Sequence, residues 1–175
     1  MNIFCYPKVL HRPQLCTLLG IDPGLSPDFD FKPRTPFSNG GVDRTEIDMR
    51  LGDLLVEAKL TETGFQMAAS RLLFRYRDLH EVFDVTELQV VGDVVHSYQL
   101  IRGVAAYTHG RSFLLLCDSR RTNLIENWFD VLRAVRGYSF RNRLKLLTWQ
   151  EVTQTLPQRL RDFLEEKYGI APVQI

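Results

Sequence analysis

Apolar and polar side chains alternate along residues 43–60, on both sides of the dipeptide Gly52-Asp53. A Gly-Asp pair between two such runs is typical of the two-residue turn that joins the strands of a β-hairpin. With this dipeptide as the turn, Leu51 lies opposite Leu54, and the remaining pairs follow from that register. One face of the hairpin is then entirely apolar and consists of Ile47, Met49, Leu51, Leu54, Val56 and Ala58. The pattern therefore predicts that this face belongs to a core.

The other face of the predicted hairpin is charged. It places Asp48 opposite Glu57, and Glu46 opposite Lys59. Opposed side chains in an antiparallel pair have Cβ atoms ~4.5–5.5 Å apart, and like charges at this distance destabilise the sheet. A divalent cation between Asp48 and Glu57 would remove the repulsion. The alternative is a surface hairpin with ordinary solvated charges, in which Glu46 and Lys59 form a cross-strand ion pair.

The N-terminal residues 1–40 differ from the rest of the chain because they contain six prolines. Proline interrupts both helices and central strands. We therefore predict an irregular arm that lies over the domain surface, with one short helical turn at residues 14–19. Asn39-Gly40-Gly41 then allows a turn into the hairpin.

Helical and strand-like patterns follow one another after the hairpin. Apolar residues recur at helical spacing in four segments: 65–83, Ser97–His109, 123–136 and 157–168. Continuous apolar runs predict strands at Phe113–Cys117 and Leu144–Trp149, whereas residues 88–95 form a strand or an extended connection. Strands joined by crossover helices predict a three-layer α/β domain, with a mixed sheet that is antiparallel at the hairpin and parallel elsewhere.

Length and composition limit the class of protein. A chain of 175 residues with 45% hydrophobic residues suits one domain with a proper core. We expect a single domain over 1–175, made of the arm (1–40), a core (41–150) and a C-terminal helix (151–175). The net charge of +1 shows no overall basicity, and three cysteines suit a reducing compartment. Without an apolar run for a signal peptide or a membrane span, we expect a cytoplasmic protein with no membrane partner.

Asp48 and the tripeptide Glu57-Ala58-Lys59 also form a motif. An Asp on one strand and an acidic-x-Lys tripeptide on the adjacent antiparallel strand resemble the signature of the PD-(D/E)XK nuclease superfamily, the restriction-endonuclease-like phosphodiesterases. The wider segments RTEID, EAKLTE, YQLIR and LTWQEV are similar to small bacterial restriction-endonuclease-like proteins. The resemblance implies the three-layer fold of that superfamily over about residues 40–150.

The resemblance also implies roles for the residues of the motif. Asp48, Glu57 and the Ala58 carbonyl would hold Mg²⁺, with Mn²⁺ as an alternative, and the metal would lower the pKa of its bound water. Lys59 would hold or polarise the attacking water and offset charge on the phosphorus.

Two further candidates stand where this sequence departs from the family pattern. Many members carry a Glu on a first helix, and Glu46 is the substitute here, although the identity of the third acidic ligand stays open. Glu46 would also hold Lys59. Members often use a Gln on the helix after the motif, for which Gln99 is the first candidate and Gln66 the second. The family's proline before the Asp is Ile47 here.

Basic residues elsewhere are candidates for contacts with phosphate groups. Those that we select for nucleic-acid binding are Arg71, Arg75, Arg102, Arg136, Arg141 and Arg143. Tyr138 and Phe140 lie among the last three and are available for base stacking. A solvated basic surface is the alternative for each group. Residues 118–121, which follow the predicted strand Phe113–Cys117, either line a cleft or cap the next helix.

Two hypotheses of different classes follow. The first is a metal-dependent DNA nuclease, an endonuclease, that uses Asp48, Glu57 and Lys59. The second is a nucleic-acid-binding or assembly module that keeps the fold without cleavage. One such site cuts one strand, so double-strand cleavage would need a homodimer, and a chain without a separate DNA-reading domain would leave specificity to a partner.

Overall fold

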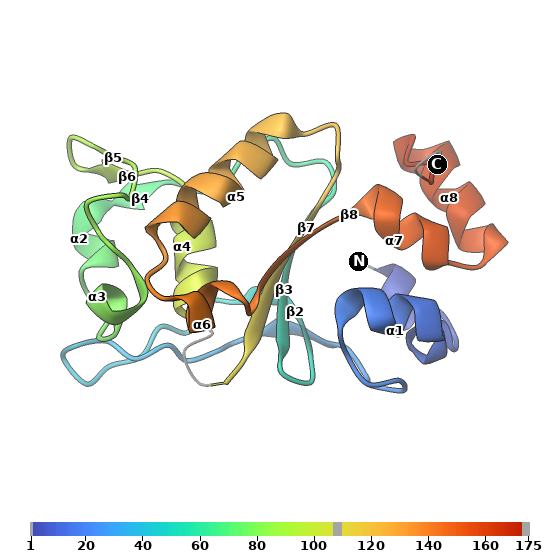
Figure 1. Cartoon of the computed structure of the whole chain (residues 1–175), viewed down its shortest axis with the longest axis horizontal. Helices are drawn as coiled ribbons and strands as arrows, with labels where there is room; N and C mark the ends of the chain where they lie inside the picture. Colours follow the sequence, from blue (N-terminus) through green and yellow to red (C-terminus); the bar gives the residue numbers. More distant parts are fainter. Residues whose placement is uncertain (1, 107–109, 173–175) are drawn as a thin grey trace.

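The computed structural model describes residues 2–106 and 110–172. Its centre is a five-stranded sheet in the order β1-β2-β3-β7-β8 (Figure 1). The strands are β1 (Asp28–Phe31), β2 (Ile47–Leu51), β3 (Leu54–Lys59), β7 (Ser112–Cys117) and β8 (Leu144–Thr148). The first three pair antiparallel, whereas β3, β7 and β8 pair parallel. The mixed sheet that the sequence predicts is therefore confirmed.

The hairpin of β2 and β3 has the expected register near its turn. Leu51 pairs with Leu54 and Met49 pairs with Val56. Gly52 adopts a φ of 56°, a left-handed conformation that favours glycine and that this class of tight turn requires.

Ile47 departs from the predicted apolar face. It packs in the core on one side of the sheet, whereas Met49 packs in the core on the other side. The ladder between β2 and β3 ends at Met49, and beyond it Ile47 pairs with Phe31 of β1. Because the strand leaves β3 here, its side chains no longer follow the alternation of the hairpin.

Two apolar cores lie on opposite faces of the sheet, and β7 contributes to both. Phe113 and Leu115 point into one core, and Leu114 and Leu116 point into the other. The first core is covered by α4 (Tyr98–Ala105) and α5 (Thr122–Ala134), and the second by α1 (Pro13–Leu19), α7 (Trp149–Thr155) and α8 (Gln158–Tyr168). Figure 1 shows these two groups of helices on either side of the strands. The three-layer arrangement is confirmed, and both faces of the hairpin are covered.

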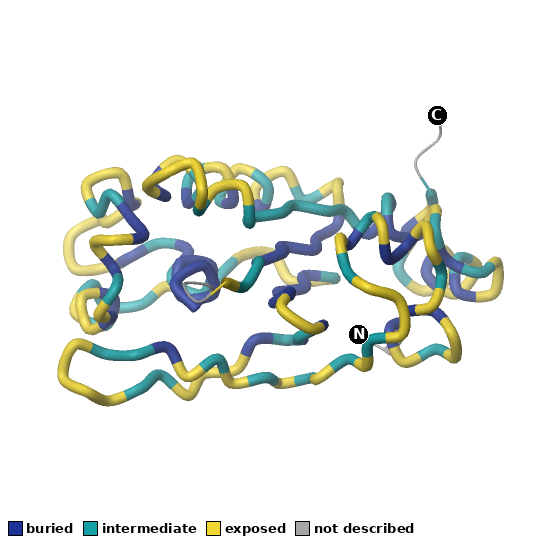
Figure 2. The backbone as a smooth tube through the Cα atoms, turned by 60° about the horizontal axis from the view of Figure 1, so that its bottom comes forward, coloured by how far each residue is buried: buried dark blue, intermediate teal, exposed yellow. Residues whose placement is uncertain are grey.

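The N-terminal arm is more ordered than the prolines predict. It contains short 3₁₀ helices at Asn2–Cys5 and Val9–His11, then α1, then β1. α1 begins with Pro13 at its first position, where a missing N–H costs nothing. β1 is an edge strand of the sheet, a position that tolerates flanking prolines such as Pro27. Figure 2 shows much of the arm as an exposed or half-buried segment, while the central strands run buried through the molecule.

The single helix predicted over residues 65–83 is wrong. This segment forms β4 (Ala68–Ala69), α2 (Ser70–Leu73) and α3 (Leu79–Val82). Between the helices, Tyr76 forms a β-bridge with Phe37 of the arm, and the backbone N–H of Ser38 donates to the Arg75 carbonyl. These tertiary bonds use backbone groups that a continuous helix would need for itself.

Residues 88–95 form a small hairpin rather than one strand. β5 (Val90–Val91) and β6 (Val94–Val95) flank Gly92, whose φ is 58°. Together with β4 they make a three-stranded sheet in the order β4-β6-β5.

The remaining helices agree with the predictions except at the C-terminus. α5 corresponds to the predicted helix 123–136, and α4 to the first part of the predicted helix from Ser97; its last predicted residues, 107–109, lie outside the described residues. A short α6 spans Tyr138–Arg141. The C-terminal helix expected over 151–175 is two helices, α7 and α8, separated at Leu156 and Pro157, and the start of α7 at Trp149 was not predicted. None of the helices in the two described ranges is long and apolar enough to cross a membrane.

Candidate active site

The motif residues lie at the carboxyl end of the parallel strands. Glu57, Ala58 and Lys59 are the last residues of β3, and they pair with residues 115–117 of β7. The first turn of α4 lies over the same end of the sheet, because Gln99 on that helix contacts β3 directly. Loops and helix termini at this end of an α/β sheet commonly carry the functional groups.

Glu57, Lys59 and Gln99 form a closed triangle of hydrogen bonds. Lys59 Nζ lies 3.0 Å from Glu57 Oε1 and donates to Gln99 Oε1 at 3.0 Å. Gln99 Nε2 in turn donates to Glu57 Oε1 at 2.6 Å. Both acidic and basic groups are buried, since Glu57 is only 2% and Lys59 only 6% exposed. The structure thus brings together three of the residues that the sequence analysis selects.

The position of Gln99 is fixed by a second glutamine. The backbone N–H of Gln99 donates to the Gln66 carbonyl at 3.3 Å, and the Gln66 N–H donates back to Gln99 Oε1 at 3.5 Å. The neighbouring Phe65 ring lies 5.7 Å from Lys59 Nζ, within reach of a cation–π contact. Gln66, the second candidate, therefore acts on the site through its backbone.

Asp48 lies beside the triangle and bonds to the backbone of the motif. Its Oδ2 accepts the N–H of Ala58 at 2.8 Å. Burial raises the pKa of Asp48, against the effect of this hydrogen bond and of the Lys59 charge. Burial, followed by the charge of Asp48, raises the pKa of Glu57 to about 7 although Lys59 acts in the opposite direction. The charge of Asp48 thus acts against ionisation of Glu57, although the β2–β3 ladder ends at Met49, one residue before the predicted Asp48–Glu57 pair.

The donor set of these residues fits a hard divalent cation. Both bonds to Glu57 end on Oε1, and the bond to Asp48 ends on Oδ2. No group of three or more His, Cys, Asp or Glu side chains within residues 2–106 and 110–172 is placed to hold a metal. Mg²⁺ is commonly bound by only one or two carboxylates together with water and substrate oxygens. A cation between Asp48 and Glu57 would also offset the repulsion that raises the pKa of Glu57.

Glu46 does not hold Lys59. Glu46 Oε1 forms an ion pair with Lys32 of the N-terminal arm at 3.2 Å, and both side chains are about half exposed. The predicted pair is wrong because Lys59 turns inward toward Glu57 and Gln99, while β1 brings the arm alongside β2.

Glu62 is the acidic residue that the sequence analysis missed. Its Oε2 accepts the N–H groups of Leu60 and Thr61 at 2.9 and 3.0 Å. Burial would raise the pKa of Glu62, but the hydrogen bonds from the backbone of residues 60–62 and the charge of Lys59 lower it. The charge of Glu62 also raises the pKa of Asp48. Its position in the sequence, three residues after Lys59, was the signal that could have identified Glu62 as a residue near the site.

Three of the selected arginines lie on or near the short helix α2 and on α4. Arg71 is exposed on α2, and the exposed Arg75 lies over the Phe37 ring at 4.2 Å from its centroid. Arg102 is buried in α4, and its Nη2 donates to the Glu46 carbonyl at 3.4 Å. Arg102 is thus placed beside the hairpin as a structural contact, and its charge is one that opposes the burial-driven rise in the pKa of Glu57.

The other three arginines lie around the amino end of β8. Arg143 directly precedes β8, whose Leu144 pairs with Phe113 at the start of β7. Arg141 donates to the carbonyls of residues 135 and 133, and Arg136 pairs with Asp84 at 3.7 Å. Parallel strands place this end of the sheet away from Lys59, so the structure does not bring these arginines to the motif.

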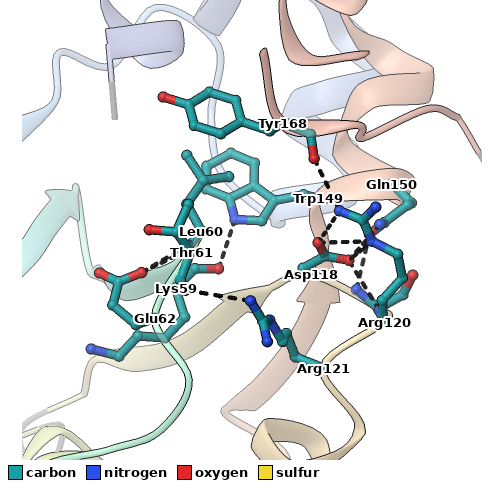
Figure 3. Close-up of polar contacts among 11 residues, drawn as sticks. Lys59, Leu60, Thr61, Glu62, Asp118, Arg120, Arg121, Trp149, Gln150 and Tyr168 are labelled. Carbon is teal, nitrogen blue, oxygen red and sulfur yellow. Dashed lines mark hydrogen bonds and ion pairs between the residues drawn. The ribbon is translucent and has the colours of Figure 1, made fainter. Parts of the chain in front are cut away.

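A second polar cluster supports the loop after the motif (Figure 3). Trp149 Nε1 donates to the Lys59 carbonyl at 3.0 Å, Arg121 donates to the Thr61 carbonyl at 3.5 Å, and Asn123 donates to the Thr63 carbonyl at 2.7 Å. α7 and the start of α5 therefore fix the backbone that carries Lys59 and Glu62.

Asp118 anchors this second cluster. It accepts bonds from Arg120 and from Gln150 Nε2, the latter at 2.7 Å, and Arg120 also donates to the Tyr168 carbonyl at 3.0 Å. Burial would raise the pKa of Asp118, but the bonds from Arg120 and Gln150 outweigh it and lower the pKa to about 2. Arg121 is the N-cap residue of α5, as the second interpretation of residues 118–121 predicts, although its side chain forms no cap hydrogen bond. The bonds of Asp118 and Arg120 also join this segment to α7 and α8.

A known protein family matches almost the whole chain, including the residues of this site. Neither a curated protein nor a solved structure matches the chain. Residues 1–169 match the family described as "Restriction Endonuclease associating with ARP". The match covers the hairpin, the motif, α4 and both C-terminal helices. The chain therefore belongs to this restriction-endonuclease family.

Proposed function

We propose that this protein is a metal-dependent nuclease that hydrolyses phosphodiester bonds of DNA as an endonuclease. The observation that carries the proposal is the pair of Asp48 and Glu57, whose pKa values are raised in a buried site beside Lys59 and Gln99. A repulsive carboxylate pair next to a buried ammonium has no evident benefit for stability. Such a combination suits a site that holds a cation and an anionic substrate.

The residues of the site have distinct roles in this proposal. Asp48, Glu57 and the Ala58 carbonyl would hold Mg²⁺ or Mn²⁺, which supplies a bound water of lowered pKa and stabilises charge on the phosphoryl oxygens. Lys59 provides a fixed positive charge at the same place. Gln99 accepts from Lys59 and donates to Glu57, so it orients both side chains before the substrate binds.

Cleavage of supercoiled plasmid and of labelled single strands in Mg²⁺ or Mn²⁺ tests the proposal. We expect cutting by the wild type and a loss of about 100-fold or more in Asp48→Ala and Lys59→Ala, since single groups that stabilise the transition state contribute about 10²–10³ in rate. Arg133→Ala is the control, because Arg133 lies in the last turn of α5, pairs with Asp130 and has a side chain 67% exposed. Equal cutting by all of these proteins would place the chemistry on other residues.

The family description favours a second candidate. It names an association with ARP, which is a protein partner of the kind that an assembly module would have. In this alternative the chain is a non-catalytic assembly module. Wild-type protein that binds DNA without cutting it in either metal, and that forms a complex with ARP, would favour this candidate over the nuclease.

A further inference from the structure

A cleft adjoins the candidate site on the side that faces α8. Its volume is about 370 Å³, within the ~300–1,000 Å³ that is usual for small-molecule sites. Asp48 and Ala58 form one wall, Leu60 and Glu62 continue it, and α8 forms the opposite wall. A side chain that would hold the cation is therefore also part of this cleft.

Aromatic rings dominate the wall formed by α8. Phe163 is 43% exposed, and its ring lies 6.1 Å from that of Tyr168 in an edge-to-face arrangement. Lys167 Nζ lies 5.4 and 5.3 Å from the two ring centroids. Trp149 also lines the cleft, below Tyr168 in Figure 3. Phe163 is exposed and Tyr168 is half-buried, whereas Trp149 is buried. Accessible rings beside a lysine are the combination that binds unpaired bases in single-stranded nucleic acids.

The charges of the cleft restrict which part of a nucleotide would enter it. Asp48 and Glu62 line the wall next to the motif, so their carboxylates disfavour a phosphate group inside. A neutral, flat base meets no such repulsion. The ammonium of Lys167 is available to a phosphate of the backbone outside the cleft.

We propose that this cleft binds an unpaired nucleobase of the substrate, next to the phosphodiester at Asp48. The proposal rests on the proposed function for nucleic acid as the ligand and for a phosphodiester held at Asp48 through the cation. A base in a duplex would have to leave its stack to enter, and this unstacking opposes binding. The substrate class that follows is single-stranded nucleic acid, or a duplex that is already locally unpaired.

Binding measured without turnover tests this proposal. Fluorescence anisotropy in Ca²⁺ compares a labelled oligo-dT with an abasic deoxyribose-phosphate oligomer of the same length. We expect the wild type to prefer oligo-dT and Phe163→Leu and Tyr168→Leu each to reduce that preference by about tenfold, because stacking of one base contributes ~1–3 kcal/mol. Affinity for the abasic oligomer should stay unchanged.

Two control variants separate stacking from other effects. Phe129→Leu removes an exposed ring on α5, outside the cleft, and Tyr168→Phe keeps the ring within it. Both should retain the wild-type preference. A wild type that does not distinguish the two oligomers, or a preference that survives both leucine variants, would overturn the proposal, and so would an equal loss in Phe129→Leu.

Failure of this proposal and failure of the nuclease proposal give different results. If the protein never cuts DNA but its preference for oligo-dT depends on Phe163, the base-binding proposal is supported and the nuclease proposal is contradicted. If cutting depends on Lys59 but the preference for oligo-dT does not depend on Phe163, the nuclease proposal is supported and the base-binding proposal is contradicted.

Discussion

Two clusters at the same end of the sheet are built from the same kinds of residues and behave in opposite ways. The end of β3 carries an acid, a base and a glutamine in Glu57, Lys59 and Gln99. The end of the neighbouring β7 is followed by an equivalent set, which consists of Asp118, Arg120 and Gln150. Burial acts on both acids, yet the pKa of Glu57 rises to about 7 and that of Asp118 falls to about 2.

The difference lies in what surrounds each acid. Asp118 receives two side-chain nitrogen atoms of Arg120, one of Gln150 and one backbone N–H. Among the described residues, none of the main influences on its pKa is a second acid. Glu57 shares one oxygen between Lys59 and Gln99 and also faces the charge of Asp48. The Asp118 cluster is complete with the protein's own atoms, as in a structural link. The cluster of Glu57, Lys59 and Gln99 has Asp48 beside it, and a bound cation would offset the charge of the two acids.

The largest expected contrast between the clusters is in stability. Asp118→Asn weakens several charge-assisted bonds, so we expect the free energy of unfolding near neutral pH to fall by about 2 kcal/mol. Asp48→Asn should leave it unchanged or raise it, because the amide oxygen still accepts the Ala58 N–H and the repulsion on Glu57 is removed. Urea unfolding of the two variants measures the contrast. Similar losses in both would mean that the Asp48–Glu57 pair is an ordinary structural contact.

A smaller contrast is expected in the pH dependence of stability. The folded-state pKa of Glu57 is raised, so its stabilising contribution is complete below its ordinary pKa and is lost as the pH rises through about 7. The folded-state pKa of Asp118 is lowered, so its contribution is present above its ordinary pKa and is lost as the pH falls toward about 2. Unfolding free energies measured across these two pH windows should show two effects. Asp48→Asn should reduce the loss of stability as the pH rises through about 7, and Asp118→Asn should reduce the loss as the pH falls toward about 2. If Asp48→Asn changed only the loss at low pH and Asp118→Asn only the loss near pH 7, the proposed difference between the two acids would be contradicted.

Local pattern was sufficient to predict the central part of the fold. Alternation around Gly52 fixed the hairpin register near the turn, and helical spacing located α4 and α5 because their buried stripes dominate those segments. The approach of Gln99 to the motif followed from the resemblance. For α7, the signal existed and was missed, since Thr148 and Glu151 form a capping box that marks a helix start.

Contacts between distant segments decided the features that local pattern could not predict. The helix over residues 65–83 is interrupted because Tyr76 and its neighbours bond to the arm. Glu46 pairs with Lys32 only because β1 joins the sheet beside β2. The Asp118 cluster depends on Gln150, which comes from another helix 32 residues away in the sequence.

Cation binding tests most directly whether the cluster of Glu57, Lys59 and Gln99 beside Asp48 holds a metal and the Asp118 cluster does not. Thermal unfolding with and without Mg²⁺ or Mn²⁺, near pH 8 where Glu57 is ionised, measures it for the wild type, Asp48→Asn and Asp118→Asn. Since a ligand that binds the folded state stabilises it, we predict a rise in Tm for the wild type and for Asp118→Asn, and none for Asp48→Asn. A wild type that responds to neither metal, or a response that Asp48→Asn retains, would contradict the central claim.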